Sequence, residues 1–309
     1  MKNLLIIHQG ALGDFVATFP AILRLRKHFC QIDALCQSKL GKLACALNVA
    51  DKCFPLEAAF FSSLYTDAVD PRVQNILRSY NEIVLFSYYH PLEQAINKVT
   101  GKNARFIPPR ADVCQPIHVT EHILSHLLKY GLLKETDAEL SYPDKREGSY
   151  DPTKILLHPG SGSRRKNWPL PNFAKIEKIL TSEGMKPEFI LGPAEYSLAE
   201  DLKDNRSVHK VSDLEELASL LRKAGGFIGN DSGVSHLAGF MGVPTVAIFG
   251  PSDPDRWKPT GRSVSIIRPD DLECSPCFEI TRNNCDKTEC LDRISIEKVS
   301  KEFVSLMSL

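Results

Sequence analysis

The stretch FIGNDSGVSHLAG, residues 227–239, is the part of the sequence that best predicts the fold. An apolar run ends at Gly229, turn and cap residues follow, and a helical pattern comes next. A strand that enters a helix this way offers an anion the free N–H groups and positive dipole end of the helix. Ser232 can donate to a phosphate oxygen, and Gly233 lets a ligand approach the backbone. The alternative is an ordinary strand–helix turn in which Asp231 or Ser232 is only the helix cap.

A second strand supports the ligand-binding interpretation. The segment TVAIFGPSDP, residues 245–254, is an apolar strand followed by a loop at the same predicted sheet edge. In open α/β sheets, ligands bind at the carboxyl ends of the parallel strands. The two segments together therefore predict a ligand site in an α/β domain.

Length and composition limit the class of protein. The 309 residues predict two domains, at 1–150 and 151–309, and the polar segment 137–152 is the best candidate linker. The 38 basic and 38 acidic residues balance, so the chain has no net positive charge that would attract nucleic acid. The chain has no apolar run of the roughly 18 residues that span a membrane, and its N-terminus resembles a strand rather than a signal peptide. We therefore expect a cytoplasmic protein without a disulfide framework.

The first half begins with an apolar strand at residues 4–7 and the turn QGALGD, residues 9–14, followed by a helix predicted over 15–29. Pro20 lies about two turns into this helix and predicts a kink there. The Gly-x-x-Gly spacing is not the Gly-x-Gly-x-x-Gly of a nicotinamide site. Asp14 lies in the first turn of the helix at a predicted ligand-binding edge, which suits a general base. The alternative role of Asp14 is that of a helix cap.

Basic and histidine side chains follow in this half. Residues 24–28 form a basic cluster that is typical of a solvated face and also suits an anionic acceptor or a membrane surface. His118, His122 and His126 repeat every four residues around a helix predicted over 120–130. Such a repeat suits metal ligands, substrate contacts or simple packing, and we favour the last two.

The second half repeats the pattern of strand, polar loop and helix. The loop PGSGSRRKNWP, residues 159–169, combines backbone donors, hydroxyls and positive charges, as a diphosphate requires, but it is not a Walker loop. The alternative is a solvated basic loop. Glu195 follows the next strand and suits either ribose hydroxyls or the N-terminus of a helix. These segments and residues 231–236 are all expected at one sheet edge, and this convergence is stronger evidence than any single motif.

The tail carries Cys274, Cys277, Cys285 and Cys290, followed by an amphipathic helix predicted over 294–309. The cysteine spacing allows a four-thiolate metal site, but the second Cys-x-x-Cys of the usual zinc pattern is missing. We therefore favour plain thiols or a redox-labile pair over a metal.

Taken together, these motifs resemble glycosyltransferase family 9, the ADP-heptose:lipopolysaccharide heptosyltransferases. The resemblance covers nearly the whole chain. It rests on GALGD at 10–14 with Pro20, HPGS at 158–161 with Lys166 and WP at 168–169, GPAE at 192–195, GNDSG at 229–233 with His236, GPSDP at 250–254, and the Cys-rich tail.

The resemblance implies an α/β chain with the GT-B fold, in which two Rossmann-like domains with parallel sheets face each other across a cleft. Domain 1–150 would bind the acceptor and domain 151–309 the nucleotide sugar, with the last helix, about 294–309, packing back on the first domain. The implied activity is inverting transfer of a heptose or related sugar from an ADP-sugar to a lipopolysaccharide core or similar envelope glycan, with no metal or other cofactor required. The lipid-linked acceptor implies peripheral contact with the cytoplasmic face of the inner membrane, and no nucleic acid is involved.

The resemblance also assigns roles to residues by position. Asp14 would be the general base, and Lys166 would bind the donor phosphates and stabilise the leaving ADP. The other implied donor-binding residues are Ser161, Gly162, Glu195, Asp231, Ser232, Gly233 and His236. The acceptor-binding residues that we expect are Gly13, Arg24, His90, Arg110 and His122. No catalytic role carries over to the tail cysteines, which mark only part of the family.

Two other functions remain open from the sequence. One is a sugar-nucleotide epimerase or hydrolase with the GT-B fold, which would leave the basic cluster at residues 24–28 without a purpose. The other is a non-catalytic nucleotide-sugar binder, which would have no need of the Asp14 carboxylate.

Overall fold

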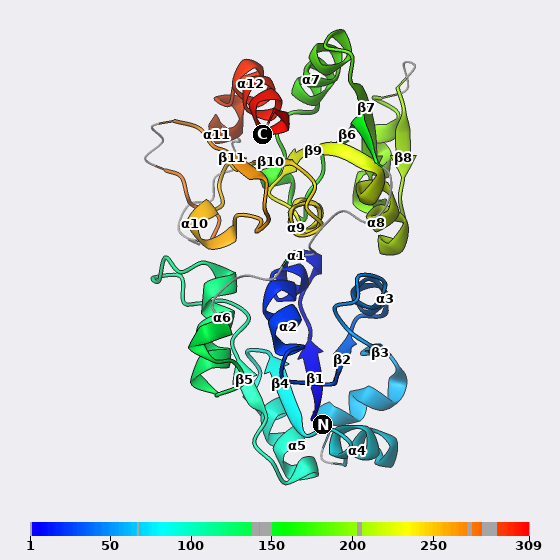
Figure 1. Ribbon diagram of the computed structural model, residues 1–309, viewed down its shortest axis with the longest axis vertical. Helices are drawn as coiled ribbons and strands as arrows, with labels where there is room; N and C mark the ends of the chain where they lie inside the picture. Colours follow the sequence, from blue (N-terminus) through cyan, green and yellow to red (C-terminus); the bar gives the residue numbers. More distant parts are fainter. Residues whose placement is uncertain are drawn as a thin grey trace. The chain divides into compact units, whose positions relative to one another are not determined.

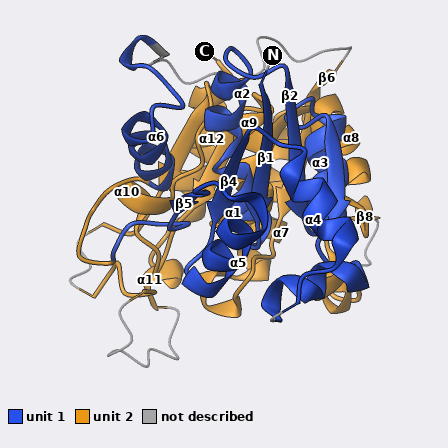
Figure 2. Ribbon diagram, turned by 90° about the horizontal axis from the view of Figure 1, so that it is seen from below, with its two compact units in different colours: residues 1–112, 119–141 blue, residues 113–118, 142–309 orange. Residues whose placement is uncertain are grey.

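The computed structural model describes residues 2–66, 68–137, 142, 150–202, 206–270, 274–279 and 289–308. The chain forms two compact units (Figure 2). The N-terminal unit holds Met1–Asp112 and Val119–Ser141, and the C-terminal unit holds Val113–His118 and Tyr142–Leu309. The division lies close to the predicted boundary at 150, but the short segment Val113–His118 belongs to the second unit. Most of the predicted linker 137–152 lies outside the described residues.

The N-terminal unit is built on a five-stranded parallel sheet with the order β3-β2-β1-β4-β5 (Figure 1). Its strands are β1 (Asn3–His8), β2 (Gln31–Cys36), β3 (Lys52–Pro55), β4 (Glu82–Phe86) and β5 (Arg105–Ile107). The central strand β1 is buried on both faces, which explains its uninterrupted apolar run.

The helices of this unit are α1 (Leu12–Val16), α2 (Phe19–Leu25), α3 (Ser38–Ala46), α4 (Pro71–Arg78), α5 (His90–Thr100) and α6 (Val119–Lys129), with 3₁₀ helices η1 (Ala59–Tyr65) and η2 (Glu135–Asp137). Elements η1, α4 and α5 pack on one another over Leu5 and Ile7 of β1. Helices α2 and α6 also pack against each other.

The helix predicted over 15–29 is in fact two helices. The first ends at Val16, and Thr18 is the N-cap of the second. Pro20 explains the break, because a proline ring clashes with the carbonyl group four residues earlier, here that of Val16, and removes the N–H that would bond to it. In α2 itself, Pro20 lies in the first turn, where proline is tolerated.

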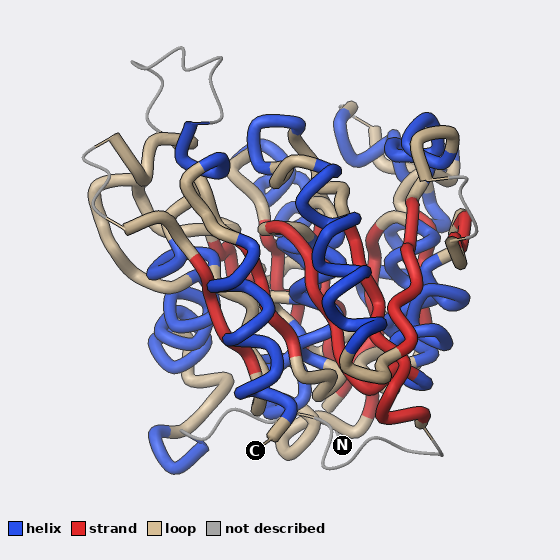
Figure 3. The backbone as a smooth tube through the Cα atoms, turned by 90° about the horizontal axis from the view of Figure 1, so that it is seen from above, coloured by secondary structure: helices blue, strands red, loops and turns tan. Residues whose placement is uncertain are grey.

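The C-terminal unit is built on a six-stranded parallel sheet with the order β11-β10-β9-β6-β7-β8. Its strands are β6 (Asp151–His158), β7 (Lys186–Leu191), β8 (Val208–Lys210), β9 (Ala224–Asn230), β10 (Thr245–Ile248) and β11 (Val264–Ile267). Its helices are α7 (Leu170–Ser182), α8 (Leu214–Lys223), α9 (Gly233–Phe240), α10 (Pro254–Trp257), α11 (Glu289–Asp292) and α12 (Ile296–Met307), with η3 (Arg164–Lys166) and η4 (Pro193–Ala199). Figure 3 shows helices lying along the strands of the sheet.

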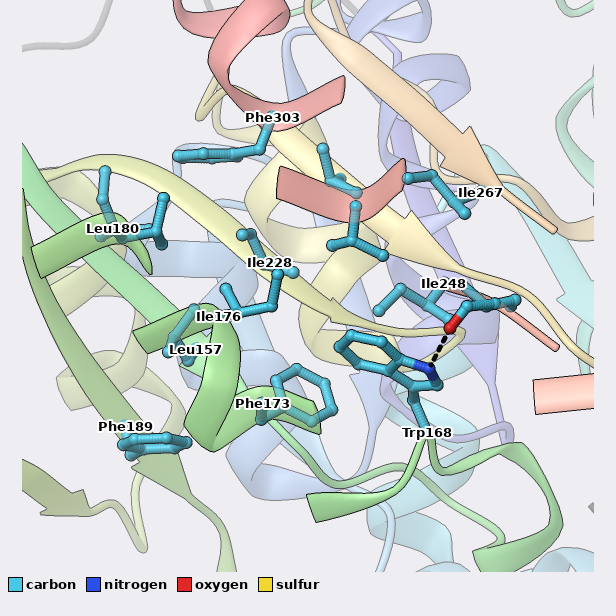
Figure 4. Packing of buried hydrophobic residues seen from close by; sticks show 14 of the residues in the cluster. Leu157, Trp168, Phe173, Ile176, Leu180, Phe189, Ile228, Ile248, Ile267 and Phe303 are labelled. Carbon is cyan, nitrogen blue, oxygen red and sulfur yellow. Dashed lines mark hydrogen bonds between the residues drawn. The ribbon is translucent and has the colours of Figure 1, made fainter. Parts of the chain in front are cut away.

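A hydrophobic core joins one face of this sheet to α7 and α12 (Figure 4). Trp168 and Phe173 pack edge to face, with ring centroids 5.2 Å apart. The indole N–H of Trp168 donates to the carbonyl oxygen of Ile294 at 3.3 Å, so the buried polar atom of the ring has a partner. Through Trp168, the core thus holds the end of the β6–α7 loop in place.

The last helix packs within the C-terminal unit, and its packing on the N-terminal domain stays a prediction. Helix α12 contacts α7, β10 and β11, and Val299 and Phe303 are fully buried in their core. Gly226 of β9 makes room for this packing, because an added Cβ would overlap the Phe303 ring. The apolar stripe of α12 is therefore already covered by its own unit. Among the described residues, no helix has the length and apolar character to span a bilayer.

Candidate functional site

Three connections of the C-terminal unit start from adjacent strand ends. The β6–β9 pairing places His158 beside Gly229, and the β6–β7 pairing places Leu157 beside Phe189. The β6–α7 loop, the β7–η4 turn and the β9–α9 turn therefore leave the same edge of the sheet. The predicted convergence of these segments is confirmed.

Asn230, at the end of β9, ties two of these connections together. Its side-chain oxygen accepts from the backbone N–H of Trp168 at 2.9 Å, and its amide donates to the carbonyl oxygen of Pro159 at 2.8 Å. The residue is fully buried, so these bonds are shielded from water. Sequence reasoning treated Asn230 only as a turn residue. Its position after a buried apolar strand was the available signal.

A pocket of about 530 Å³ lies between the β6–α7 loop and η4. Ser161, Gly162 and Glu195, three of the expected donor-binding residues, line it together with Arg164. This volume is within the range of small-molecule sites. The pocket thus gathers part of the predicted donor site.

Ser161 organises the loop, and Gly162 leaves it open. The Ser161 hydroxyl lies 2.7 Å from the carbonyl oxygen of Ser163 and 2.6 Å from the side-chain oxygen of Asn167, and it accepts from the Ser163 N–H at 3.2 Å. A hydroxyl has one proton and can donate to only one of those two oxygens at a time. Around Gly162, by contrast, no atom lies within 4 Å of an added Cβ, so this part of the backbone is accessible to a ligand.

Glu195 closes one side of the pocket. Its carboxylate accepts from the backbone N–H of Gly192 at 3.0 Å, which caps the start of η4. The side chain is buried against Gly160, where an added Cβ would overlap the carboxyl group. The alternative role of Glu195 as a helix N-terminal acid is therefore confirmed by geometry, and the residue also lines the pocket.

Lys166 and Asp231 form a second group of predicted residues. Lys166 Nζ lies 2.8 Å from Asp231 Oδ2, and the Asp231 side chain is only 6% exposed. This distance is that of a charge-assisted contact between an ammonium group and a carboxylate. The ammonium group also lies 4.3 Å from the ring centroid of Phe278, a cation–π contact. The lysine is thus held by the Asp231 charge and by the Phe278 ring, and because an ammonium group has three protons it can still donate to a ligand.

The start of α9 completes this group. Ser232 is the N-cap, and its hydroxyl oxygen accepts from the Ser235 N–H at 3.3 Å, so the cap alternative for Ser232 is confirmed. Gly233 is the first helical residue. His236 is buried, and desolvation lowers its pKa to about 4 although the Asp231 charge acts in the opposite direction. The imidazole is therefore neutral at neutral pH.

His118 lies near His236 and Asp231, whereas the four-residue repeat in the sequence grouped it with His122 and His126. It precedes α6, belongs to the C-terminal unit, and one ring nitrogen hydrogen-bonds with the carbonyl oxygen of Lys258 at 2.9 Å. Its charge also influences the pKa of His236. Of the three histidines, only His122 and His126 lie within the helix, because α6 begins at Val119.

In the N-terminal unit, Asp14 lies in the first turn of α1 after Gly13. Its Oδ2 accepts from the backbone N–H of Ala11 at 3.3 Å, which is the geometry of the helix-cap alternative. His8, at the end of β1, lies close by: an added Cβ on Gly10 would be 2.8 Å from His8 Cε1 and 2.9 Å from Asp14 Cβ. The two side chains are therefore packed around Gly10.

His8 is a residue that sequence reasoning missed. Burial lowers the pKa of its imidazole to about 3, and Nδ1 accepts from the Gly10 N–H at 3.2 Å. This bond leaves the proton of the neutral ring on Nε2. A single polar residue at the end of an apolar strand was the signal that was available.

Two of the expected acceptor residues are exposed at the same edge. His90 begins α5 after β4, pairs with Glu93 at 3.1 Å and stacks on Phe106. Arg110 follows β5, and its carbonyl oxygen accepts from the Tyr88 hydroxyl at 3.3 Å. Since β1, β4 and β5 are neighbours in a parallel sheet, these residues and Asp14 follow adjacent strand ends.

Arg24 and His122, by contrast, are not surface residues. Arg24 is 3% exposed, so the basic cluster at 24–28 is not one solvated face, and Arg26 pairs with Asp51 at 3.2 Å. His122 is buried, with a ring nitrogen 2.9 Å from the carbonyl oxygen of Pro108. Six of the seven residues of α2 are buried, Arg24 among them, and His122 lies on the buried face of α6 beside Ile123. His122 and His126 pack ring to ring at 4.4 Å, which confirms the packing alternative for these two.

The cysteine tail is only partly described. Cys274, Cys277 and Cys290 line a cavity of about 40 Å³, and Cys285 lies outside the described residues. The described parts of the chain hold no cluster of three or more His, Cys, Asp or Glu side chains that could bind a metal. The four-thiolate arrangement therefore stays an untested alternative.

The profile of glycosyltransferase family 9 (heptosyltransferase) matches residues 128–287, slightly more than half of the sequence. The chain belongs to glycosyltransferase family 9. The matched segment includes the pocket and the Lys166–Asp231 pair, whereas Asp14 lies outside it.

Curated proteins similar to this chain include lipopolysaccharide heptosyltransferase 1 of Campylobacter coli, which is 30% identical over 117 residues, 35% of this chain and 34% of the relative. The chain spans between about a third and a half of the length of the curated relatives that it matches.

Two solved structures extend the comparison to the whole fold. A family 9 glycosyl transferase from Veillonella parvula has a TM-score of 0.77 at 20% identity, covering 99% of this chain and 97% of its own. ADP-heptose lps heptosyltransferase II of E. coli has a TM-score of 0.74 at 17% identity, covering 100% and 99%. Together with the two parallel sheets, they confirm the GT-B fold that the resemblance implied.

Proposed function

We propose that this chain is an inverting glycosyltransferase that moves a heptose or a related sugar from an ADP-sugar to a lipopolysaccharide core or similar envelope glycan. The proposal is supported by family membership and by the names of the similar proteins, which include an ADP-heptose heptosyltransferase acting on lipopolysaccharide. The observation that carries it is the placement of a pocket and a charge-held lysine at adjacent strand ends of the C-terminal sheet.

The donor is proposed to bind across these two groups of residues. Lys166 is suited to the diphosphate because its ammonium group has three protons and can pair with Asp231 while it donates to phosphate oxygens. Ser161, Gly162 and the backbone around Ser232 and Gly233 hold phosphate oxygens, as helix N-termini do. Glu195 takes the ribose from the pocket wall. Neutral His236 and Asp231 complete the site, and this histidine adds no positive charge of its own.

The proposed reaction is a single displacement. As the acceptor oxygen bonds to the anomeric carbon of the donor, the Asp14 carboxylate takes the proton of the acceptor hydroxyl. The bond from that carbon to the phosphate oxygen breaks, and its electron pair leaves with ADP. Lys166 stabilises the charge that develops on the leaving diphosphate. Attack opposite the leaving group inverts the anomeric configuration, and no step requires a metal.

The acceptor is proposed to be a lipid-linked saccharide, reached by peripheral contact with the cytoplasmic face of the inner membrane. His90 and Arg110 would contact it directly because they are exposed beyond strand ends. Gly13 would offer backbone contacts beside Asp14. Arg24 and His122 are buried, so they would support the acceptor-binding surface without contacting the acceptor directly.

Isothermal titration calorimetry with ADP, UDP and NAD, without added metal, tests the donor assignment. We expect selective ADP binding. Preference for UDP would move the donor to another sugar nucleotide, and preference for NAD would contradict the proposal. Incubation of an ADP-sugar without acceptor separates the alternative, because an epimerase or hydrolase would convert the donor on its own.

A further inference from the structure

Three large aromatic side chains are exposed together in the N-terminal unit. Tyr65 is 48% exposed, Tyr88 57% and Tyr89 49%. Tyr65 ends η1, and the other two follow β4. Aromatic rings carry much apolar surface and are usually buried, so a group of exposed rings points to a binding surface.

Two of these rings are held in place. The ring centroids of Tyr65 and Tyr89 are 6.1 Å apart, with the ring planes inclined by 31°. The side-chain amide of Gln9 donates to the Tyr65 hydroxyl. The Ser87 hydroxyl donates to the side-chain oxygen of Gln9 at 3.1 Å and accepts from the Tyr89 N–H at 3.0 Å. Gln9 and Ser87 therefore link the two tyrosines in one network, which limits the entropy that a ligand would have to remove.

The network lies at the carboxyl edge of the N-terminal sheet, where the loop that leads to Asp14 leaves β1. Gln9 begins the β1–α1 loop that leads to Asp14, and Ser87 follows the end of the neighbouring strand β4. The register pairs His8 with Phe86, so Gln9 and Ser87 leave these strands side by side. A ligand on the tyrosines would thus lie next to the loop of the proposed base.

We propose that Tyr65, Tyr89 and Gln9 form a subsite that stacks a pyranose ring of the acceptor saccharide. The inference rests on the proposed function and deepens it by naming the part of the acceptor that is recognised. The weakly positive C–H face of a sugar ring complements the negative face of an aromatic ring. The hydroxyls at the edge of the sugar would meet the Gln9 amide and the phenol oxygens.

The chemistry of the surface favours a sugar over an acyl chain or an apolar protein partner. Its rings are tyrosines, and their edges carry hydrogen-bonding atoms that an acyl chain could not satisfy. His90 and Arg110 are exposed beyond the adjacent strand ends and suit an acidic group on the saccharide. An amphipathic and partly charged ligand therefore matches this surface best.

The test compares Tyr65→Ala and Tyr89→Ala with Tyr65→Phe and Tyr89→Phe, and uses Tyr150→Ala as a control. Tyr150 is exposed to the same extent, 48%, but belongs to the C-terminal unit. The probe is deacylated lipopolysaccharide core oligosaccharide, and its binding is measured by calorimetry and by saturation-transfer NMR without donor. A stacking contact of about 1.4 kcal/mol corresponds to a factor of ten in affinity.

We expect each alanine variant to weaken oligosaccharide binding and raise the acceptor KM roughly tenfold. The affinity for ADP, the donor KM and kcat should stay unchanged. The phenylalanine variants should retain most of the affinity because they keep the rings, and sugar C–H protons should receive saturation in the wild type. Tyr150→Ala should bind normally.

Unchanged oligosaccharide affinity in both alanine variants would overturn the inference, and so would a wild type that binds ADP but not the oligosaccharide. The inference would also be overturned if the alanine variants lost binding to phosphatidylglycerol vesicles but still bound the oligosaccharide. That result would assign the tyrosines to a membrane-binding surface. Failure of the proposed function looks different: the wild type would then bind no ADP or transfer no sugar, whatever the tyrosine variants do.

Discussion

The ion pair between Lys166 and Asp231 differs from the surface pairs of the molecule. In the exposed pair of Arg72 with Asp70, the arginine side chain is 68% exposed, and such pairs contribute little to stability. Asp231 is nearly buried, so its carboxylate depends on the lysine charge. Removing one partner of a buried pair leaves an uncompensated charge and costs about 3–5 kcal/mol.

Lys166→Met should therefore lower the free energy of unfolding by roughly 3 kcal/mol and abolish ADP binding. The double variant Lys166→Met/Asp231→Asn should recover much of the stability, because no buried charge remains, but it should not recover ADP binding. Urea denaturation and calorimetry measure the two effects, with Lys175→Met on the exposed surface of α7 as control. A double variant that binds ADP like the wild type would show that Lys166 has no role in the donor site.

For individual residues, the sequence motifs predicted which polar side chains lie at strand ends, but not which contacts these side chains make. The cap role of Ser232 and the charge of Lys166 follow from local sequence. The role of Asn230 does not, because it depends on backbone atoms of Pro159 and Trp168 that are more than 60 residues away. The burial of Arg24 and of His8 likewise depends on elements packed over them and not on their neighbours in sequence.

Among the structural elements, the β6–α7 loop depends on two glycines in different ways. Gly160 lies against the Glu195 carboxyl group, whereas Gly162 faces open space. Gly160→Ala should destabilise the protein by about 1–3 kcal/mol, since the added methyl displaces Glu195 and narrows the pocket. Gly162→Ala is the matched control and should leave stability within about 0.5 kcal/mol.

Thermal unfolding and ADP titration of both glycine variants measure this difference. Equal stability of the two variants, with unchanged ADP affinity, would mean that the loop does not pack on η4 as described.

The alternation of apolar strands and helices predicted most elements that surround the carboxyl edges of the two sheets, such as β9, α9 and β10. Pro20 predicted a kink in the helix over 15–29, and its steric conflict with Val16 in fact ends the first helix. The position of α12 could not be predicted from its own sequence. The amphipathic pattern of a helix indicates that one face is buried, but it does not indicate against which elements. Here those elements are α7, β10 and β11.

For the whole molecule, buried neutral histidines in both units link stability to pH. Desolvation lowers the pKa of His8 to about 3 and that of His236 to about 4, against 6.5 in the unfolded chain. The unfolded state then binds more protons between pH 6.5 and 4, so the free energy of unfolding rises with pH in this range. The stabilisation is fully present above pH 6.5 and is lost as pH falls through the folded-state values.

Urea denaturation at pH 7, 5.5 and 4.5 should therefore show decreasing stability. In the variant His8→Asn, whose side-chain oxygen can replace Nδ1 as acceptor for the Gly10 N–H, the decrease should be smaller. Substitution of the exposed His28 by Gln is the control and should leave the pH dependence as in the wild type. A His8→Asn profile parallel to that of the wild type would contradict the account of a buried neutral imidazole.

The two units repeat one plan, a parallel sheet with its polar residues beyond the carboxyl edge, and the central claim assigns the chemistry to Asp14. The most direct test is NMR analysis of the product formed from ADP-heptose and lipopolysaccharide core acceptor by the wild type and by Asp14→Asn, with Glu183→Gln as a control. We predict a glycoside of inverted anomeric configuration from the wild type and the control. Asp14→Asn should form it at least about 100-fold more slowly while binding ADP normally. Retained configuration, or transfer by Asp14→Asn at the wild-type rate, would contradict the account.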